Sequence, residues 1–344
     1  MPTLTPEKLI IAFHKLSDFI ADPSEDFKNL VLSARNSNAW FSEEEVEKAL
    51  RSLQKMLNPS DLMTWFEDVL ISDTPKKIGL ILAGNIPMVG FHDVLCVVAT
   101  GNIALIKLSS SDDKLLPALF SELVKIEPLL EKSIVYTERL KDFDAIIATG
   151  SNNTSRYFEY YFGKVPNIIR RNRNSVAVLT GEESAEEIAL LGHDIFDYFG
   201  LGCRNVSKLY IPADYEIRNF YEPLEPFKKI ADHFKYNNNY DYNKSIYLVN
   251  LADHFDNGFL LLKEDQAMAS PLAVLYYERY KALSDVAEIL EREQDKIQCV
   301  VSKAGSGLNV AAVGFGESQS PKLWDYADNV NTIEFLNSLY WQGQ

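Results

Sequence analysis

Hydrophobic positions follow a helical pattern in the first part of the chain and a different pattern afterwards. Thr5 and Pro6 form a cap followed by a proline at the first helical position. The apolar residues after them lie three or four positions apart: Leu9, Ile10, Phe13, Leu16, Phe19 and Ile20. The sequence Ser42-Glu43-Glu44-Glu45 has the form of a capping box, which predicts a further helix. We therefore predict a helical N-terminal segment, residues 1–75, that packs and carries no chemistry.

From residue 76 onward, short apolar runs alternate with helical patterns. Strands are predicted over residues 78–82, 103–108, 133–136 and 145–148, with helices near 88–99, 113–126 and 153–162. Such alternation is typical of βαβ units and a parallel sheet, whose ligands bind at the carboxyl ends of the strands. Residues 76–172 are therefore predicted to form one parallel-sheet domain. A binding site is expected in the loops that follow its strands.

A second alternating series predicts a further parallel-sheet domain over residues 173–320. Its predicted strands are 175–180, 208–212, 246–249, 272–277, 297–301 and 309–313, and its helices are 183–199, 222–235 and 280–291. The polar stretch 236–243 is predicted to be a surface loop. Residues 321–344 form a C-terminal tail whose aromatic residues favour either a cover over the catalytic domain or a self-association surface. The fold class is thus α/β, with two parallel-sheet βα domains and an N-terminal helical segment.

Composition narrows the class of protein. The 344 residues, 47% of them hydrophobic, suffice for two domains with sizeable cores. The net charge of -15 argues against a nucleic-acid partner and against an anionic membrane surface. The three cysteines lie far apart, so neither a disulfide framework nor a metal site is predicted. With no signal-peptide pattern and no run of 18 apolar residues, we expect no membrane span and a cytoplasmic location.

Three loops of the first predicted domain carry small polar or basic residues directly after a strand. The first loop contains Asn85, the second contains Lys107, Ser109 and Ser110, and the third contains Thr149, Gly150 and Ser151. An amide beside a helix start can donate to an oxygen that gains negative charge, although a plain turn asparagine has the same appearance. A lysine with hydroxyls suits a phosphate or a ribose, and backbone N–H groups at a helix start suit a diphosphate. None of these loops is a G-x-G-x-x-G fingerprint.

Cys203 follows a helical pattern and two glycines, Gly200 and Gly202, and precedes the apolar run from Leu209. This order predicts a sharp helix-to-strand turn, where a substrate can reach the thiol. A free cysteine is more often a small buried hydrophobe, so the residue by itself leaves a structural role open.

Taken in order, these segments resemble the aldehyde dehydrogenase superfamily. Gly84-Asn85-Ile86-Pro87 is similar to the asparagine loop of that superfamily, and Gly101 to Lys107 is similar to the strand that ends in its lysine. Thr149-Gly150-Ser151 is similar to its diphosphate turn, and Gly202-Cys203 with Lys208 is similar to its nucleophile segment. The blocks 84–93 and 325–336 resemble, more narrowly, the LuxC-type acyl-CoA reductases of bacterial luminescence. This resemblance extends from about residue 76 to the C-terminus.

The resemblance implies reduction of a fatty acyl-CoA to a long-chain aldehyde with NADPH, through an acyl thioester on Cys203. It implies Asn85 and the Cys203 N–H as oxyanion donors, and the nucleotide on Lys107, Ser109, Ser110, Thr149, Gly150 and Ser151. The hydrolytic glutamate of aldehyde dehydrogenases would fall within residues 168–171, which contain no carboxylate. A ribose-binding glutamate is replaced near Ser110, which permits a 2′-phosphate, although Asp112 is close in sequence.

Several alternatives stay open at this stage. An acyltransferase or thioesterase would use the same acyl-cysteine without a nucleotide, and a non-catalytic acyl-binding partner would not use the thiol. The acyl donor is either CoA or a protein, and a homo-oligomer or a partner acyl-transferring enzyme is equally compatible with the sequence. The superfamily's block with the glutamate for the nicotinamide ribose would fall on residues 267–271, which contain no carboxylate, so this glutamate is missing unless Glu264 or Asp265 serves. His92 and His193 either tune the thiolate or are structural, and Arg170, Arg171 and Arg173 either hold CoA phosphates or form salt bridges.

Overall fold

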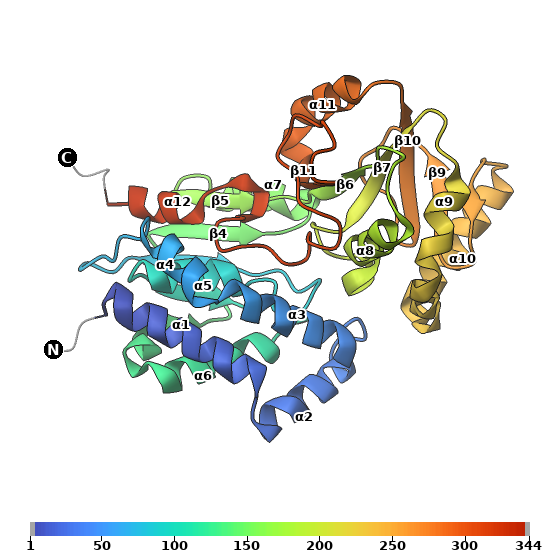
Figure 1. Ribbon diagram of the computed structural model, residues 1–344. Helices are drawn as coiled ribbons and strands as arrows, with labels where there is room; N and C mark the ends of the chain where they lie inside the picture. Colours follow the sequence, from blue (N-terminus) through green and yellow to red (C-terminus); the bar gives the residue numbers. More distant parts are fainter. Residues whose placement is uncertain (1–3, 341–344) are drawn as a thin grey trace. The chain divides into compact units, whose positions relative to one another are not determined.

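The computed structural model describes residues 4–340, which divide into two compact units (Figure 1). The first unit combines the chain up to Asn172 with the chain from Ser320 onward, and the second unit is Arg173–Gln319. The N-terminal helices and the C-terminal segment therefore belong to the same unit. Within residues 4–340, no helix has both the length and the apolar character needed to cross a bilayer.

The first unit begins with a helical layer, as predicted. Its helices are α1 (Pro6–Ala21), α2 (Glu25–Ser33), α3 (Glu43–Met56) and α4 (Pro59–Phe66), with a 3-10 turn at Ala34–Asn36. The Thr5 hydroxyl accepts a hydrogen bond from the Lys8 N–H at 3.4 Å, and Ser42 caps α3 in the same way through the Glu45 N–H. The inward face of α1, with Leu9, Phe13 and Leu16, is fully buried.

The sheet of the first unit has five parallel strands in the order β3-β2-β1-β4-β5. These are β1 (Lys77–Ile81), β2 (Ile103–Lys107), β3 (Ile134–Tyr136), β4 (Ala145–Thr149) and β5 (Asn167–Arg170), joined through α5 (Phe91–Ala99), α6 (Leu115–Ile126), a 3-10 helix (Pro128–Ser133) and α7 (Asn152–Phe162). The chain runs outward in opposite directions from β1 and β4, so a topological switch point lies between them.

Two local predictions in this unit were wrong. Helix α5 begins at Phe91 and not near residue 88, because Met88 has a left-handed backbone (φ 55°) that cannot continue a helix. Pro87 is therefore not in its first turn. Strand β5 was not predicted at all, since its four residues precede a run of arginines and carry too short a pattern.

The C-terminal segment, predicted as a separate tail, packs on the first unit. It contains a 3-10 turn (Ala327–Asn329) and α12 (Thr332–Ser338), drawn in red in Figure 1, and α12 contacts α5. The buried Trp65 indole N–H donates to the Tyr326 hydroxyl at 2.9 Å, which ties α4 to this segment. The aromatic residues that suggested an external interface are in part used for this internal contact.

The second unit contains a six-stranded sheet in the order β11-β6-β7-β10-β9-β8. The parallel strands are β6 (Asn174–Val178), β7 (Val206–Pro212), β9 (Leu261–Glu264), β10 (Val274–Tyr280) and β11 (Ile297–Ser302), and β8 (Phe255–Asp256) is antiparallel at the edge. The helices are α8 (Ala185–Phe196), α9 (Ile217–Tyr221), α10 (Phe234–Val249) and α11 (Leu283–Arg292), with 3-10 segments at Asp197–Gly200, Glu222–Asp232 and Gln294–Lys296. The core beside α8 includes Leu191, Leu209 and Ile211.

Four further predictions failed in the second unit. The expected loop 236–243 and the expected strand 246–249 both belong to α10, whose buried Tyr236, Tyr240 and Tyr247 recur at helical spacing among the asparagines. The expected strand 309–313 is irregular apart from one bridge between Val301 and Val313. The predicted helix 222–235 is a 3-10 helix interrupted by Pro226.

Candidate active-site loops and cysteine turn

In the first unit, three of the predicted loops leave the same edge of the sheet. Strands β2, β1 and β4 are neighbours, and Ile81 at the end of β1 pairs with Lys107 on one side and Ala148 on the other. Neighbouring strands lie about 4.8 Å apart. The loops containing Asn85, Lys107 and Thr149 are therefore adjacent at the carboxyl edge, beside the switch point. The side chains of Asn85 and Lys107 are exposed there.

The asparagine loop and the serine loop interlock. A Cβ on Gly84 would lie 2.5 Å from the Ser109 hydroxyl, so only glycine allows the two loops to pack this closely. Asp112 accepts a hydrogen bond from the Met88 N–H at 2.6 Å and is 6% exposed. Its burial raises its pKa to about 6. The carboxyl group of Asp112 thus faces the loop interior, while Lys107 and Ser110 face solvent.

The predicted diphosphate turn lies between β4 and α7. The Ser151 hydroxyl caps α7 by accepting from the Thr154 N–H at 3.3 Å. The Gly150 N–H is directed to the Arg170 carbonyl at 3.4 Å and extends the pairing of β4 with β5. This N–H is thus used within the sheet. The donors left for an anion are those of the first turn of α7, which have no partner inside a helix.

Cys203 lies in the second unit, in the helix-to-strand turn that the sequence predicted. Helix α8 ends at Phe196, and Tyr198, Phe199 and Gly200 then adopt left-handed backbones with φ of 54°, 56° and 78°. The Asn205 N–H donates to the Gly202 carbonyl at 3.1 Å, so Cys203 and Arg204 are the two central residues of a tight turn. Cys203 is half-buried, and β7 begins just after this turn.

Two residues that the sequence analysis did not single out hold this turn. The Asn205 side chain joins the Gly202 N–H to the end of α8, and the Ser175 hydroxyl donates to the Cys203 carbonyl at 3.0 Å. An asparagine two places after Gly-Cys was a turn signal in the sequence. Nothing near Ser175 in sequence indicated that it contacts residue 203.

Lys208, the basic residue of the nucleophile segment, is fully buried in β7. Its ammonium group donates to the Asp265 carbonyl at 2.6 Å and to the Glu278 carboxylate at 2.9 Å. The Asp265 carboxylate binds Lys263, whose ammonium lowers the pKa of that group. Of the two candidates for the nicotinamide ribose, Asp265 is thus occupied by its own loop and Glu264 is exposed.

The two histidines have different surroundings. A ring nitrogen of His92 lies 2.9 Å from the Leu323 carbonyl, and its ring packs against Trp65 and Tyr326 within the first unit. These contacts are those of a structural histidine. His193, on α8 of the second unit, lies 3.3 Å from the Asp197 carboxylate and packs edge-on against Phe227.

The arginine cluster is used inside the protein. Arg170 is 2% exposed and binds the carboxylate of Asp93, the carbonyl of Ala327 and the hydroxyl of Thr332. Arg171 pairs with Glu159, and Arg173 donates to the carbonyls of Gln294 and Ile297. These contacts favour the internal alternative over a CoA-phosphate site, most clearly for the buried Arg170.

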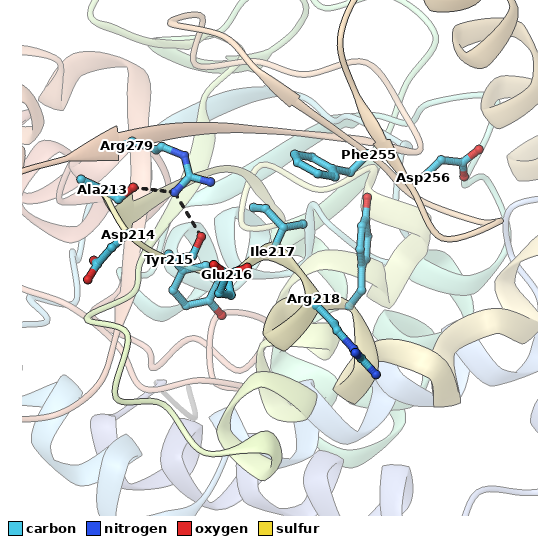
Figure 2. A pocket seen from close by; sticks show the side chains of 10 residues that line it. Ala213, Asp214, Tyr215, Glu216, Ile217, Arg218, Phe255, Asp256 and Arg279 are labelled. Carbon is cyan, nitrogen blue, oxygen red and sulfur yellow. Dashed lines mark hydrogen bonds between the residues drawn. The ribbon is translucent and has the colours of Figure 1, made fainter.

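An open pocket of about 580 Å³ lies elsewhere in the second unit (Figure 2). Its Arg279 guanidinium donates to the carbonyls of Ala213 and Tyr215 at 2.9 and 3.1 Å. The pocket follows the carboxyl end of β7, whereas Cys203 precedes the amino end of the same strand. A seven-residue strand is about 23 Å long, so this pocket does not adjoin the thiol.

Comparison with known sequences identifies one family. The family model described as acyl-CoA reductase (LuxC) matches residues 25–218, more than half of the chain. A long-chain acyl-protein thioester reductase from Aliivibrio fischeri is 25% identical over 164 residues, an alignment that covers 43% of this chain and 34% of that protein. The chain thus matches about a third of the length of this relative.

Solved structures with the same fold include aldehyde dehydrogenases. One from Physcomitrella patens, in complex with succinate, has a TM-score of 0.65 at 11% identity, with 97% of this chain and 85% of that chain covered. One from Mycobacterium tuberculosis, in complex with NAD+, has a TM-score of 0.62 at 12% identity, with 91% and 77% covered. The predicted fold class is confirmed. The chain belongs to the LuxC acyl-CoA reductase family and has the aldehyde dehydrogenase fold.

Proposed function

We propose that this protein reduces a long-chain acyl thioester to an aldehyde with NADPH, through an acyl thioester on Cys203. The observation that carries the proposal is the position of Cys203, half-buried at the centre of a tight turn ahead of β7, in a chain of this family. The relative from Aliivibrio fischeri is named for thioester reduction, which is the same class of reaction.

In the first step, the Cys203 thiolate attacks the carbonyl carbon of the donor thioester. A new C–S bond forms at Cys203, the donor's C–S bond breaks, and the donor leaves as a thiolate. The Cys203 N–H is the proposed donor to the oxyanion, and the resemblance of its loop assigns the Asn85 amide to the same role. Because one thioester replaces another, this exchange is close to balanced, and positioning of the thiol matters more than strong acid-base assistance.

In the second step, the acyl group on Cys203 is reduced. NADPH, when bound, supplies the hydride for the carbonyl carbon. The C–S bond of the resulting thiohemiacetal anion on Cys203 breaks, so that the aldehyde leaves and the Cys203 thiolate is restored. Residues 168–171, where a hydrolytic glutamate would fall, contain no carboxylate. This absence supports an acyl-enzyme that is reduced rather than hydrolysed by water.

For the nucleotide, the residues of the first unit suit a 2′-phosphate. Lys107 and Ser110 are exposed after β2, and the Asp112 carboxyl group that would repel a phosphate is buried against Met88. Ser109 lies between them. The first turn of α7, capped by Ser151 after Thr149 and Gly150, is the proposed diphosphate site.

The acyl donor is proposed as CoA or a protein-bound thioester. The family description names acyl-CoA, whereas the relative from Aliivibrio fischeri is named for an acyl-protein. The internal contacts of Arg170 and Arg173 remove one argument for CoA phosphates at that cluster. An experiment therefore needs both kinds of donor.

The test is mass spectrometry of the intact protein after incubation with myristoyl-CoA, or with myristoyl-loaded carrier protein, beside a Cys203→Ala variant. We expect a myristoyl adduct on the wild type, absent from the variant and discharged as aldehyde on addition of NADPH. Discharge as free fatty acid, at a rate that NADPH does not change, would identify a thioesterase. No adduct from either donor would refute the acyl-cysteine route.

A further inference from the structure

The segment that leads to Cys203 is conformationally costly. Tyr198, Phe199 and Gly200 are three successive left-handed residues, and two of them carry side chains. A left-handed backbone costs a non-glycine residue about 1–2 kcal/mol. Such a run persists only where its surroundings over-determine it. Specific groups must therefore hold the chain between the end of α8 and the start of β7.

Asn205 bridges the two ends of this segment. Its side-chain carbonyl accepts from the Gly202 N–H at 2.8 Å. Its amide NH2 group donates to three carbonyls at the end of α8, those of Asp194, Ile195 and Asp197, at 3.2, 3.4 and 2.8 Å. Terminal helix carbonyls lack partners inside the helix, so this single side chain satisfies them and fixes the distance to the turn. Asn205 is 3% exposed, so water competes little for these bonds.

The two peptide groups on either side of Cys203 are held separately. The Asn205 N–H binds the Gly202 carbonyl at 3.1 Å, and in a trans peptide the Cys203 N–H must then point the opposite way. The Ser175 hydroxyl binds the Cys203 carbonyl at 3.0 Å. Ser175 is fully buried, and its own N–H donates to the Asn205 carbonyl at 3.3 Å. With both flanking peptide planes fixed, the side-chain torsion is the main freedom left to the thiol.

We propose that Asn205 and Ser175 are positioning residues for Cys203, which aim its thiol and its backbone N–H at the acyl carbonyl. The inference rests on the proposed role of Cys203 as the acylated nucleophile. Neither residue touches the acyl group. They act by fixing the backbone on both sides of residue 203, and a small misplacement of a nucleophile costs about 100-fold in rate.

Two substitutions test this. Asn205→Asp keeps the size of the side chain but turns an oxygen toward the carbonyls of α8, which removes a donor and adds repulsion. Ser175→Ala removes the hydroxyl and keeps the N–H bond to Asn205. Ser175→Thr restores a hydroxyl and serves as the conservative rescue. Matched controls are Asn219→Asp, at an exposed asparagine of the second unit, and Ser245→Ala, where an exposed hydroxyl donates to the Asp241 carbonyl.

Two rates are measured on folded protein at a temperature well below each variant's melting point. Alkylation of Cys203 by iodoacetamide across pH is followed by peptide mass spectrometry, with the two control variants as the reference, because Cys299 itself contacts the Ser175 hydroxyl through its thiol and its N–H. Acylation by myristoyl-CoA is followed by intact mass. We expect Asn205→Asp and Ser175→Ala to slow acylation about 10-fold to 100-fold and to change the Cys203 alkylation profile, with partial recovery in Ser175→Thr.

The outcomes separate this inference from the proposed function. Wild-type rates in folded Ser175→Ala and Asn205→Asp would overturn the positioning role, even if the wild type is acylated. A lower melting temperature with unchanged Cys203 chemistry would assign both residues to stability alone and would also overturn it. If no donor acylates the wild type but the variants alter Cys203 alkylation, the two residues control the reactivity of the thiol, whereas the reductase proposal and the orientation toward an acyl carbonyl both fail. Should Asn205→Asp not fold, the Ser175 pair decides.

Discussion

The two units present their candidate residues at opposite ends of parallel strands. In the first unit, Asn85, Lys107 and Thr149 follow β1, β2 and β4 at the carboxyl edge of the sheet. In the second unit, Cys203 precedes β7 and lies at the amino edge. Strand order alone brings the first set together, because carboxyl ends of parallel neighbours meet. The cysteine turn has no such help and depends on two buried side chains, those of Ser175 in β6 and of Asn205 in the turn itself.

This comparison predicts that single substitutions at the cysteine turn of the second unit lower the reaction rate more than single substitutions in the loops of the first unit weaken ligand binding. In loops that strand order brings together, several N–H groups and side chains share the binding of one ligand. A turn held by two buried residues has no substitute for either.

The largest effect is expected at the thiol itself. Cys203→Ser should lower the rate of aldehyde formation at least about 1000-fold, because removal of a nucleophile abolishes the covalent route. The melting temperature should stay within a few degrees of the wild type, since the substitution is nearly isosteric. NADPH consumption measures the rate, and thermal unfolding followed by circular dichroism measures the melting temperature. Retention of a tenth of the activity would exclude Cys203 as the nucleophile.

The next effect concerns pH and a buried carboxyl group in each unit. Burial raises the pKa of Asp194 to about 6 from 3.8, and Asp194 accepts from the N–H groups of Gly316 and Ser318. The folded state therefore binds the proton more tightly than the unfolded state. Stability from this group is fully present below pH 3.8 and falls as pH rises toward 6, by up to about 3 kcal/mol.

Urea unfolding at pH 4 and pH 7 measures this dependence. Asp194→Asn should remove it, and Asp112→Asn should remove the corresponding dependence in the first unit, since burial raises the pKa of Asp112 to about 6 as well. Asp253→Asn, at an exposed aspartate, is the control. Equal pH slopes for Asp194→Asn and the wild type would contradict the burial argument.

A smaller effect is expected at the carboxyl edge of the first sheet. Lys107→Ala should raise the KM for NADPH about 10-fold, equal to ~1.4 kcal/mol, and should change the KM for NADH less, because the lost charge faces the proposed 2′-phosphate. Lys77→Ala is the matched control, since Lys77 is an exposed lysine at the amino end of β1. An equal increase for both nucleotides would place Lys107 at another part of the cofactor.

The smallest effect compares the caps of two helices. Ser151 caps α7 in the first unit and Ser184 caps α8 in the second, where Glu187 completes a capping box. Replacing either serine with alanine should cost about 1 kcal/mol of stability. Only Ser151→Ala should also raise the KM for NADPH, by a few-fold. If both variants raise it, the first turn of α7 is not the diphosphate site.

Sequence patterns were sufficient where the signal is local. The alternation of apolar runs and helical patterns predicted most strands of both sheets, and the helix-to-strand turn at Cys203 followed from its glycines. The helix α10 was missed, because four asparagines hide the tyrosine periodicity that buries its inner face. The start of α5 was misplaced, since nothing in the sequence shows that Met88 is left-handed.

The supports of the candidate site were beyond sequence reasoning, because they depend on contacts between distant residues. Ser175 lies 28 positions before Cys203, and its bond to the Cys203 carbonyl arises only when β6 and β7 pair. Asp112 and Lys208 are likewise buried by packing. The sequence around each of them showed neither its binding partner nor the direction of its side chain.

The first unit is discontinuous, and this has a consequence for synthesis on the ribosome. The buried Arg170 obtains its carbonyl partner from Ala327, 157 positions later in the chain. Trp65 waits 261 positions for the hydroxyl of Tyr326. The second unit, Arg173–Gln319, is complete in one stretch and emerges before these partners are translated. The unit that begins first is therefore the last to be completed, and the nascent chain carries the sheet of the first unit without these contacts until the segment that follows Gln319 has been translated.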